Sequence, residues 1–89
     1  MIDTVELGKF LYLLRISHNY TQSFVEDITE ISERALRYIE SGEAMPRLDT
    51  YCILCDLYGI DPSFGFIFYY RSSVMKANME IFADQIVNF

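Results

Sequence analysis

Apolar residues recur at intervals of three and four along most of this chain. Because an α-helix has about 3.6 residues per turn, such intervals gather apolar side chains on one side of a helix. The pattern predicts helices over residues 4–18, over two short segments within 21–42, over 48–58 and 62–70, and over a last segment that ends near residue 87. The predicted fold class is therefore all-α.

Capping residues divide the segment 21–42 into two helices joined by a tight turn. Thr21 is a favourable N-cap for the first helix, Ser32 begins the second, and Gly42 ends it. The apolar stripe of the first helix and the residue expected to fill the turn are Phe24, Val25, Ile28 and Ile31. In the second helix, the inward positions are Ala35, Leu36 and Ile39, and the outward positions are Glu33, Arg34, Arg37 and Tyr38.

The first predicted helix is apolar over a broader face than one amphipathic stripe requires. Its polar side carries Lys9 and Arg15. In this helix Leu7, Leu11 and Leu14 are expected in the core. The core residues expected over the whole domain, from the helices and the turn, are Leu11, Leu14, Val25, Ile31, Leu36, Ile39, Leu54 and Leu57.

The C-terminal part of the chain is unusually apolar. Asp61 and Pro62 form a strong helix start, and the helix that follows is apolar nearly all round. In the last helix, apolar residues repeat at four, three, four and three, which is the spacing of a seam between two helices. The seam either folds back on its own domain or joins two copies, and we expect a homodimer. The residues expected at the dimer interface are Phe66, Tyr69, Met79, Phe82, Ile86 and Phe89.

Composition supports a partner and restricts its nature. Seven Phe and seven Tyr in 89 residues are more aromatic side chains than a small monomer easily buries. Seven basic and thirteen acidic residues give a net charge of -6, and residues 1–60 hold five basic and ten acidic side chains. This acidity argues against nonspecific binding to nucleic acid, because that affinity comes from neutralising phosphates with Lys and Arg. Sequence-specific binding requires that Arg15, Arg34, Arg37 and Arg47 gather on one face.

Candidate catalytic and metal-binding residues are few. Cys52 and Cys55 have CxxC spacing, but a single pair inside a helix, on its apolar side, indicates core packing with free thiols. His18 lacks neighbouring acids or cysteines with which to form a metal or catalytic site. We expect no enzymatic activity, no cofactor and no metal. A chain with no run of about 18 apolar residues and an acidic N-terminus is expected to be cytoplasmic, without membrane insertion or secretion.

The chain resembles the lambda-repressor and Cro class of helix-turn-helix domains, often called Xre-like, over residues 5–68. The residues that carry the resemblance are Leu7-Gly8-Lys9, Arg15, Thr21-Gln22, Ile31-Ser32, Leu36, Ile39-Glu40, Gly42, Pro46, Leu48, Leu54, Leu57 and Gly59-Ile60. The resemblance implies a five-helix DNA-binding domain, here residues 1–70. The apolar repeat described above predicts an additional C-terminal helix in residues 71–89, a candidate dimerisation element. The resemblance also implies sequence-specific binding to operator DNA and transcriptional regulation.

By this resemblance, the helix that begins at Ser32 enters the major groove. Arg34 or Arg37 would read guanine, with Arg37 the first choice, and Glu33 would accept a hydrogen bond from a cytosine amino group. Gln22, at the start of the preceding helix, and Arg47 would contact phosphates. The resulting DNA-binding residues are Gln22, Ser32, Glu33, Arg34, Arg37 and Arg47. The alternative is a solvated helix face on which the arginines pair with nearby acids.

Two residues depart from the family pattern. Glu26 stands where the family usually has alanine, which predicts that its helix is displaced and packs through Phe24 and Val25. Glu30 stands where the turn usually has glycine, which predicts either mild strain or a different turn. These acids favour a second function, an acidic protein-interaction module such as an antirepressor or regulatory partner that does not bind DNA. The two functions differ in whether the arginines form a positive strip or are each neutralised.

Overall fold

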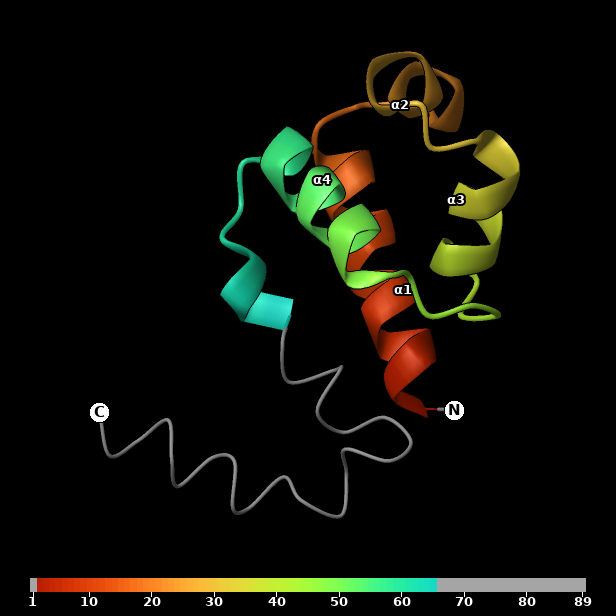
Figure 1. The fold of residues 1–89 in the computed structure, drawn as a ribbon, viewed down its shortest axis with the longest axis vertical. Helices are drawn as coiled ribbons and strands as arrows, with labels where there is room; N and C mark the ends of the chain where they lie inside the picture. The colour runs from red at the N-terminus through yellow and green to blue at the C-terminus, as the bar shows by residue number, and fades with distance from the viewer. Residues whose placement is uncertain (1, 66–89) are drawn as a thin grey trace.

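The computed structural model describes residues 2–65, and all the secondary structure in that range is helical (Figure 1). The elements are α1 (Ile2–Ser17), α2 (Gln22–Thr29), α3 (Glu33–Glu40), α4 (Leu48–Tyr58) and a short 3-10 helix, η1 (Pro62–Gly65). The all-α prediction is confirmed. The remainder of the predicted fifth helix, the predicted last helix and the six predicted dimer residues lie outside the described residues.

The helix boundaries follow the caps that the sequence predicts. Thr21 and Ser32 have extended backbones, and their hydroxyl oxygens accept hydrogen bonds of 3.0 Å from the N–H groups of Phe24 and Ala35. Gly59 ends α4 with a φ of 69°, a conformation that glycine adopts without steric cost. The helix over 48–58 is confirmed at both ends.

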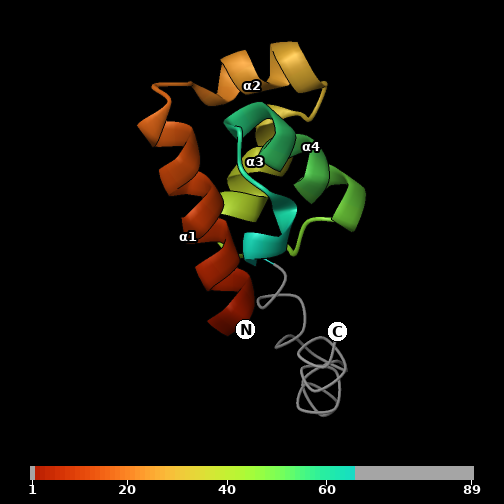
Figure 2. The same cartoon turned by 90° about the vertical axis from the view of Figure 1, so that its left-hand side faces the viewer.

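The helix α1 is the longest one described, and α2 lies across its C-terminal end (Figures 1 and 2). The backbone of α1 approaches the last turn of α3 so closely at Gly8 that a Cβ there would collide with the Ile39 carbonyl oxygen. The buried apolar residues are Leu7, Leu11, Val25, Leu36, Ile39, Tyr51, Leu54, Cys55 and Tyr58. Three residues predicted for the core, Leu14, Ile31 and Leu57, are half-buried and pack against this cluster.

The start of the predicted fifth helix is present as the 3-10 helix η1. Asp61 accepts a 2.9 Å hydrogen bond from the Ser63 N–H through its Oδ1, and this bond lowers the pKa of the Asp61 carboxyl. The Tyr51 hydroxyl donates a 2.6 Å hydrogen bond to the carbonyl of Pro62, which attaches η1 to α4.

The predicted apolar stripe of α2 is wrong for two of its three members. Val25 is fully buried, but Phe24 and Ile28 are 40% and 57% exposed, and the Phe24 ring stacks on Tyr20 at a centroid distance of 4.7 Å. The inward side of α2 consists of Gln22, Val25, Glu26 and Thr29. These four lie at the i, i+3, i+4 and i+7 positions of one helix face. Its polar members can face inward because each has a hydrogen-bond partner.

Candidate nucleic-acid interface

The turn between α2 and α3 has the geometry that usually requires glycine. Glu30 has a φ of 66° and a ψ of 5°, in the left-handed region, and its N–H donates to the Glu26 carbonyl at 2.8 Å. The strained alternative predicted for Glu30 is therefore the one observed. Ile31 is half-buried in the turn and packs against the core, as predicted.

Glu26 connects α2 to the first residue of α3. Its Oε1 accepts a 3.0 Å hydrogen bond from the Glu33 N–H. The Ser32 hydroxyl oxygen accepts one from the Ala35 N–H. Two of the backbone donors that a helix leaves open at its N-terminus are therefore satisfied by side chains. The carboxylate also complements the partial positive charge of that helix end, although it adds negative charge beside the start of α3.

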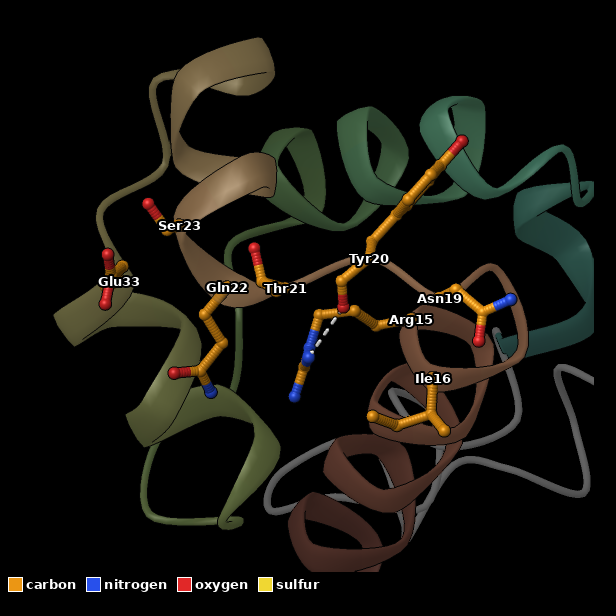
Figure 3. Close-up of a pocket in the computed structure, with 8 residues that line it drawn as sticks. All are labelled: Arg15, Ile16, Asn19, Tyr20, Thr21, Gln22, Ser23 and Glu33. Atoms are coloured by element: carbon orange, nitrogen blue, oxygen red, sulfur yellow. Dashed lines mark hydrogen bonds between the residues drawn. The ribbon is translucent and has the colours of Figure 1, made fainter.

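A buried polar network fixes the angles between α1, α2 and α3. Arg15 of α1 donates to both carboxylate oxygens of Glu40, with Nε–Oε2 and Nη2–Oε1 distances of 2.7 and 2.9 Å, and to the Tyr20 carbonyl at 2.9 Å. Gln22 donates to Glu40 Oε1 at 3.0 Å. Figure 3 shows Arg15 pointing from α1 toward the start of α2, in a hollow that extends to Glu33.

The placement of Arg15 on the polar side of its helix is therefore corrected. Arg15 is 7% exposed, because the bidentate contact with Glu40 compensates for loss of water. The hydrogen bond to Glu40 raises the pKa of Arg15 above its ordinary value. Arg15 therefore does not belong to a surface strip of arginines.

The outward side of α3 carries two arginines. Arg34, Arg37, Tyr38 and Ser41 lie at i, i+3, i+4 and i+7 and, with Glu43, line an open hollow of about 440 Å³. Arg37 Nη1 is 3.8 Å from Glu33 Oε2, and the two side chains are 60% and 41% exposed. The Arg34 Cζ lies over the Tyr38 ring, 5.8 Å from its centroid.

The two predicted phosphate contacts already have partners within the chain. Arg47 is highly exposed at the start of α4, and its Nε is 3.4 Å from Asp49 Oδ1. The Gln22 side-chain amide is occupied by Glu40. Of the four arginines expected on one face, only Arg34 and Arg37 share the outward side of α3, and the ion pairs described involve Arg15, Arg37 and Arg47.

Sequence reasoning predicted that Tyr38 points outward but did not include it, or Ser41, among the site residues. Their spacing from Arg34 in the sequence, four and seven residues, could have identified both. Residues four and seven positions further along a helix lie on the same face as the first. The two residues therefore belong to the candidate interface by position.

The remaining candidate chemical groups are the two cysteines and the histidine. Burial raises the pKa of the Cys55 thiol, and Cys52 and Cys55 are both free. His18 is exposed and lies near the Tyr20 ring, with a centroid distance of 5.3 Å. Within residues 2–65, no three His, Cys, Asp or Glu side chains are arranged to hold a metal ion. In the same part of the chain, no helix has the length and apolar character needed to span a membrane.

Comparison with known proteins gives one result. A helix-turn-helix family model matches residues 11–64, which extend from the middle of α1 into η1 and include α2, α3 and α4. No curated protein and no solved structure matches the chain significantly.

Proposed function

This chain belongs to the lambda-repressor/Xre-like helix-turn-helix family, and from that premise we propose that it is a transcriptional regulator that binds specific sequences of double-stranded DNA through the outward side of α3. The observation that carries the proposal is the pair of exposed arginines, Arg34 and Arg37, on the outward side of the second helix of the motif. In this class of domain, that helix enters the major groove and its early residues contact base edges.

The contacts proposed along α3 follow from side-chain chemistry. A guanidinium group can donate two hydrogen bonds to guanine O6 and N7, and a carboxylate can accept one from the cytosine amino group. Arg34 or Arg37 would supply the first kind of contact and Glu33 the second. Ser32 would lie near the base edges, and Gln22 and Arg47 would contact phosphates.

The electrostatic contribution to this binding is small. If three exposed arginines, Arg34, Arg37 and Arg47, all contact phosphates, each chain contributes only about -2.7 to the slope of log K against log salt. The intramolecular partners of Arg37 and Arg47 must also be given up or shared. We therefore expect affinity to depend mainly on base contacts.

The proposed regulator is a homodimer. A two-fold dimer would place two copies of α3 about one DNA turn apart, on an operator with two related half-sites. Support comes from the four-three apolar repeat in residues 75–89 and from the surplus of aromatic residues. Phe64, which lies near the start of the predicted fifth helix, is 68% exposed.

A second candidate function is supported by the ion pairs. Because Arg15 is buried and Arg37 and Arg47 each contact a carboxylate, the continuous positive strip expected of a DNA-binding face is missing from residues 2–65. This arrangement is what an acidic protein-interaction module, such as an antirepressor or regulatory partner, would have. Its partner would carry a basic surface.

Selection from random-sequence duplexes, followed by fluorescence anisotropy at about 50 and 150 mM salt, tests both functions. The DNA-binding proposal predicts an enriched operator and a Kd at least about tenfold lower than for scrambled DNA. Arg47→Ala should weaken binding to all sequences alike. Lys9→Ala, which removes an exposed cation from α1, is the matched control and should have less effect. Absence of any sequence preference at about 50 mM salt would contradict the proposal and favour the interaction module.

A further inference from the structure

The two outward arginines of α3 are held by different kinds of partner. Arg34 lies against the Tyr38 ring at 5.8 Å, whereas Arg37 lies 3.8 Å from the Glu33 carboxylate. A cation over an aromatic ring is attracted electrostatically by the quadrupole of the ring. This attraction does not require the five N–H donors of the guanidinium group to bond to an oxygen acceptor. A carboxylate partner, in contrast, attracts the N–H edge itself.

Bidentate reading of guanine requires two N–H donors from the edge of one guanidinium group. Arg34 can offer such an edge while it remains on the Tyr38 ring. Arg37 Nη1 lies 3.8 Å from Glu33 Oε2, so a guanine read by Arg37 would have the Glu33 carboxylate near its acceptors O6 and N7, which the carboxylate repels. The partners therefore favour Arg34 and disfavour Arg37 for the same contact.

Position along α3 supports the same assignment. Arg34 is the second residue of the helix, and Arg37 is nearly one turn further along. In a recognition helix, the N-terminal residues contact the base edges most directly. Tyr38 is four residues after Arg34, which places its ring beside the Arg34 side chain on the outward face.

We propose that Arg34 is the residue that reads guanine in the operator, and that Tyr38 is a positioning residue that holds its guanidinium group ready. This inference rests on the proposed DNA-binding function and replaces the sequence-based preference for Arg37. The role of Arg37 is then to balance Glu33 and to add unspecific attraction to DNA. Removal of the Glu33 charge by Glu33→Gln should release Arg37 and strengthen binding to scrambled DNA, and it should reduce the preference at the cytosine that Glu33 is proposed to contact.

The test measures Kd by fluorescence anisotropy for the selected operator and for duplexes with each base pair changed, using the full chain. Arg34→Ala should weaken operator binding by about 5- to 150-fold and remove the preference at one G·C pair. Tyr38→Leu should reduce the preference at the same base pair, and Tyr38→Phe, which retains the ring, should leave it unchanged. Arg37→Ala should weaken operator and scrambled DNA by the same factor.

Circular dichroism of each variant provides the folding control, since Arg34 and Tyr38 are both exposed. If Arg37→Ala, and not Arg34→Ala, removes the preference, the assignment of Arg34 is overturned while the proposed function stands. An equal loss for Tyr38→Phe and Tyr38→Leu overturns the positioning role of the ring. A wild-type protein without sequence preference overturns both this inference and the proposed function.

Discussion

Removal of Arg15 is expected to destabilise the fold far more than removal of any other arginine in residues 2–65. The side chains of Arg15 and Glu40 are 9% and 6% exposed, and they form two hydrogen bonds with each other. Arg15→Met keeps most of the apolar stem but leaves the Glu40 carboxylate buried with Gln22 as its remaining partner. It also removes the donor to the Tyr20 carbonyl.

The expected loss in the free energy of unfolding follows from the charge that Arg15→Met leaves buried on Glu40. Removing one member of a buried ion pair costs about 3–5 kcal/mol, because the other charge stays out of water without compensation. A small domain has a total stability of about 5–15 kcal/mol, so Arg15→Met would remove a large part of it. The double variant Arg15→Met/Glu40→Met removes both charges and is expected to cost less than either single variant.

Urea unfolding followed by far-UV circular dichroism measures these costs, since the chain has no tryptophan to report on packing. Arg37→Met is the matched control, because Arg37 also pairs with a glutamate but its side chain is 60% exposed. Exposed pairs contribute about 0–1 kcal/mol, so this variant should unfold near the wild-type midpoint. The reasoning is refuted if Arg15→Met costs no more than Arg37→Met, or if the double variant costs the sum of the two single ones.

Three further predictions follow from individual residues. Glu30→Gly should raise the free energy of unfolding by about 1 kcal/mol, because glycine adopts a φ of 66° without strain; a lower midpoint in urea would contradict this. Burial raises the pKa of Tyr58 from 10.0 to about 12, so the contribution of Tyr58 to stability should be retained below pH 10 and fall by up to about 2.7 kcal/mol as the pH rises toward 12. Tyr58→Phe should abolish this loss and be no less stable at neutral pH, since the hydroxyl has no hydrogen-bond partner among the described residues; an identical pH profile for both proteins would refute the assignment. Phe82→Glu should convert the proposed dimer to a monomer in sedimentation, and a wild-type monomer at tens of micromolar would exclude the dimer.

Local chemistry is what made most of the fold predictable. A hydroxyl at Thr21 or Ser32 can cap only the helix that follows it, and Gly59 provides the left-handed conformation that ends the helix before it. The required partners are a few residues away in the chain. The helix starts in this region, and the end of α4, could therefore be read from sequence alone.

Pairing between distant residues is what the sequence did not reveal. Gln22 and Arg15 meet Glu40 across separations of 18 and 25 residues, and Glu26 meets the Glu33 N–H seven residues away. A pattern of apolar and polar positions assigns such residues to the surface, because it does not include partners that satisfy a buried polar group. This is why Phe24 and Ile28 were predicted, together with Val25, on the inward face of α2.

The same long-range pairing decides which charges remain for a nucleic acid. The counts of basic and acidic residues suggest a chain poorly suited to DNA, but they do not separate charges used within the fold from charges left on its surface. Glu40 pairs with Arg15 in the buried polar network, so neither charge is left on the surface. Glu26 accepts a hydrogen bond at the start of α3. Arg34 is the arginine of α3 whose described contact is a ring rather than a carboxylate. In the proposed complex, recognition therefore depends on this side chain and on the doubling of its contact by a second copy, rather than on a broad positive surface.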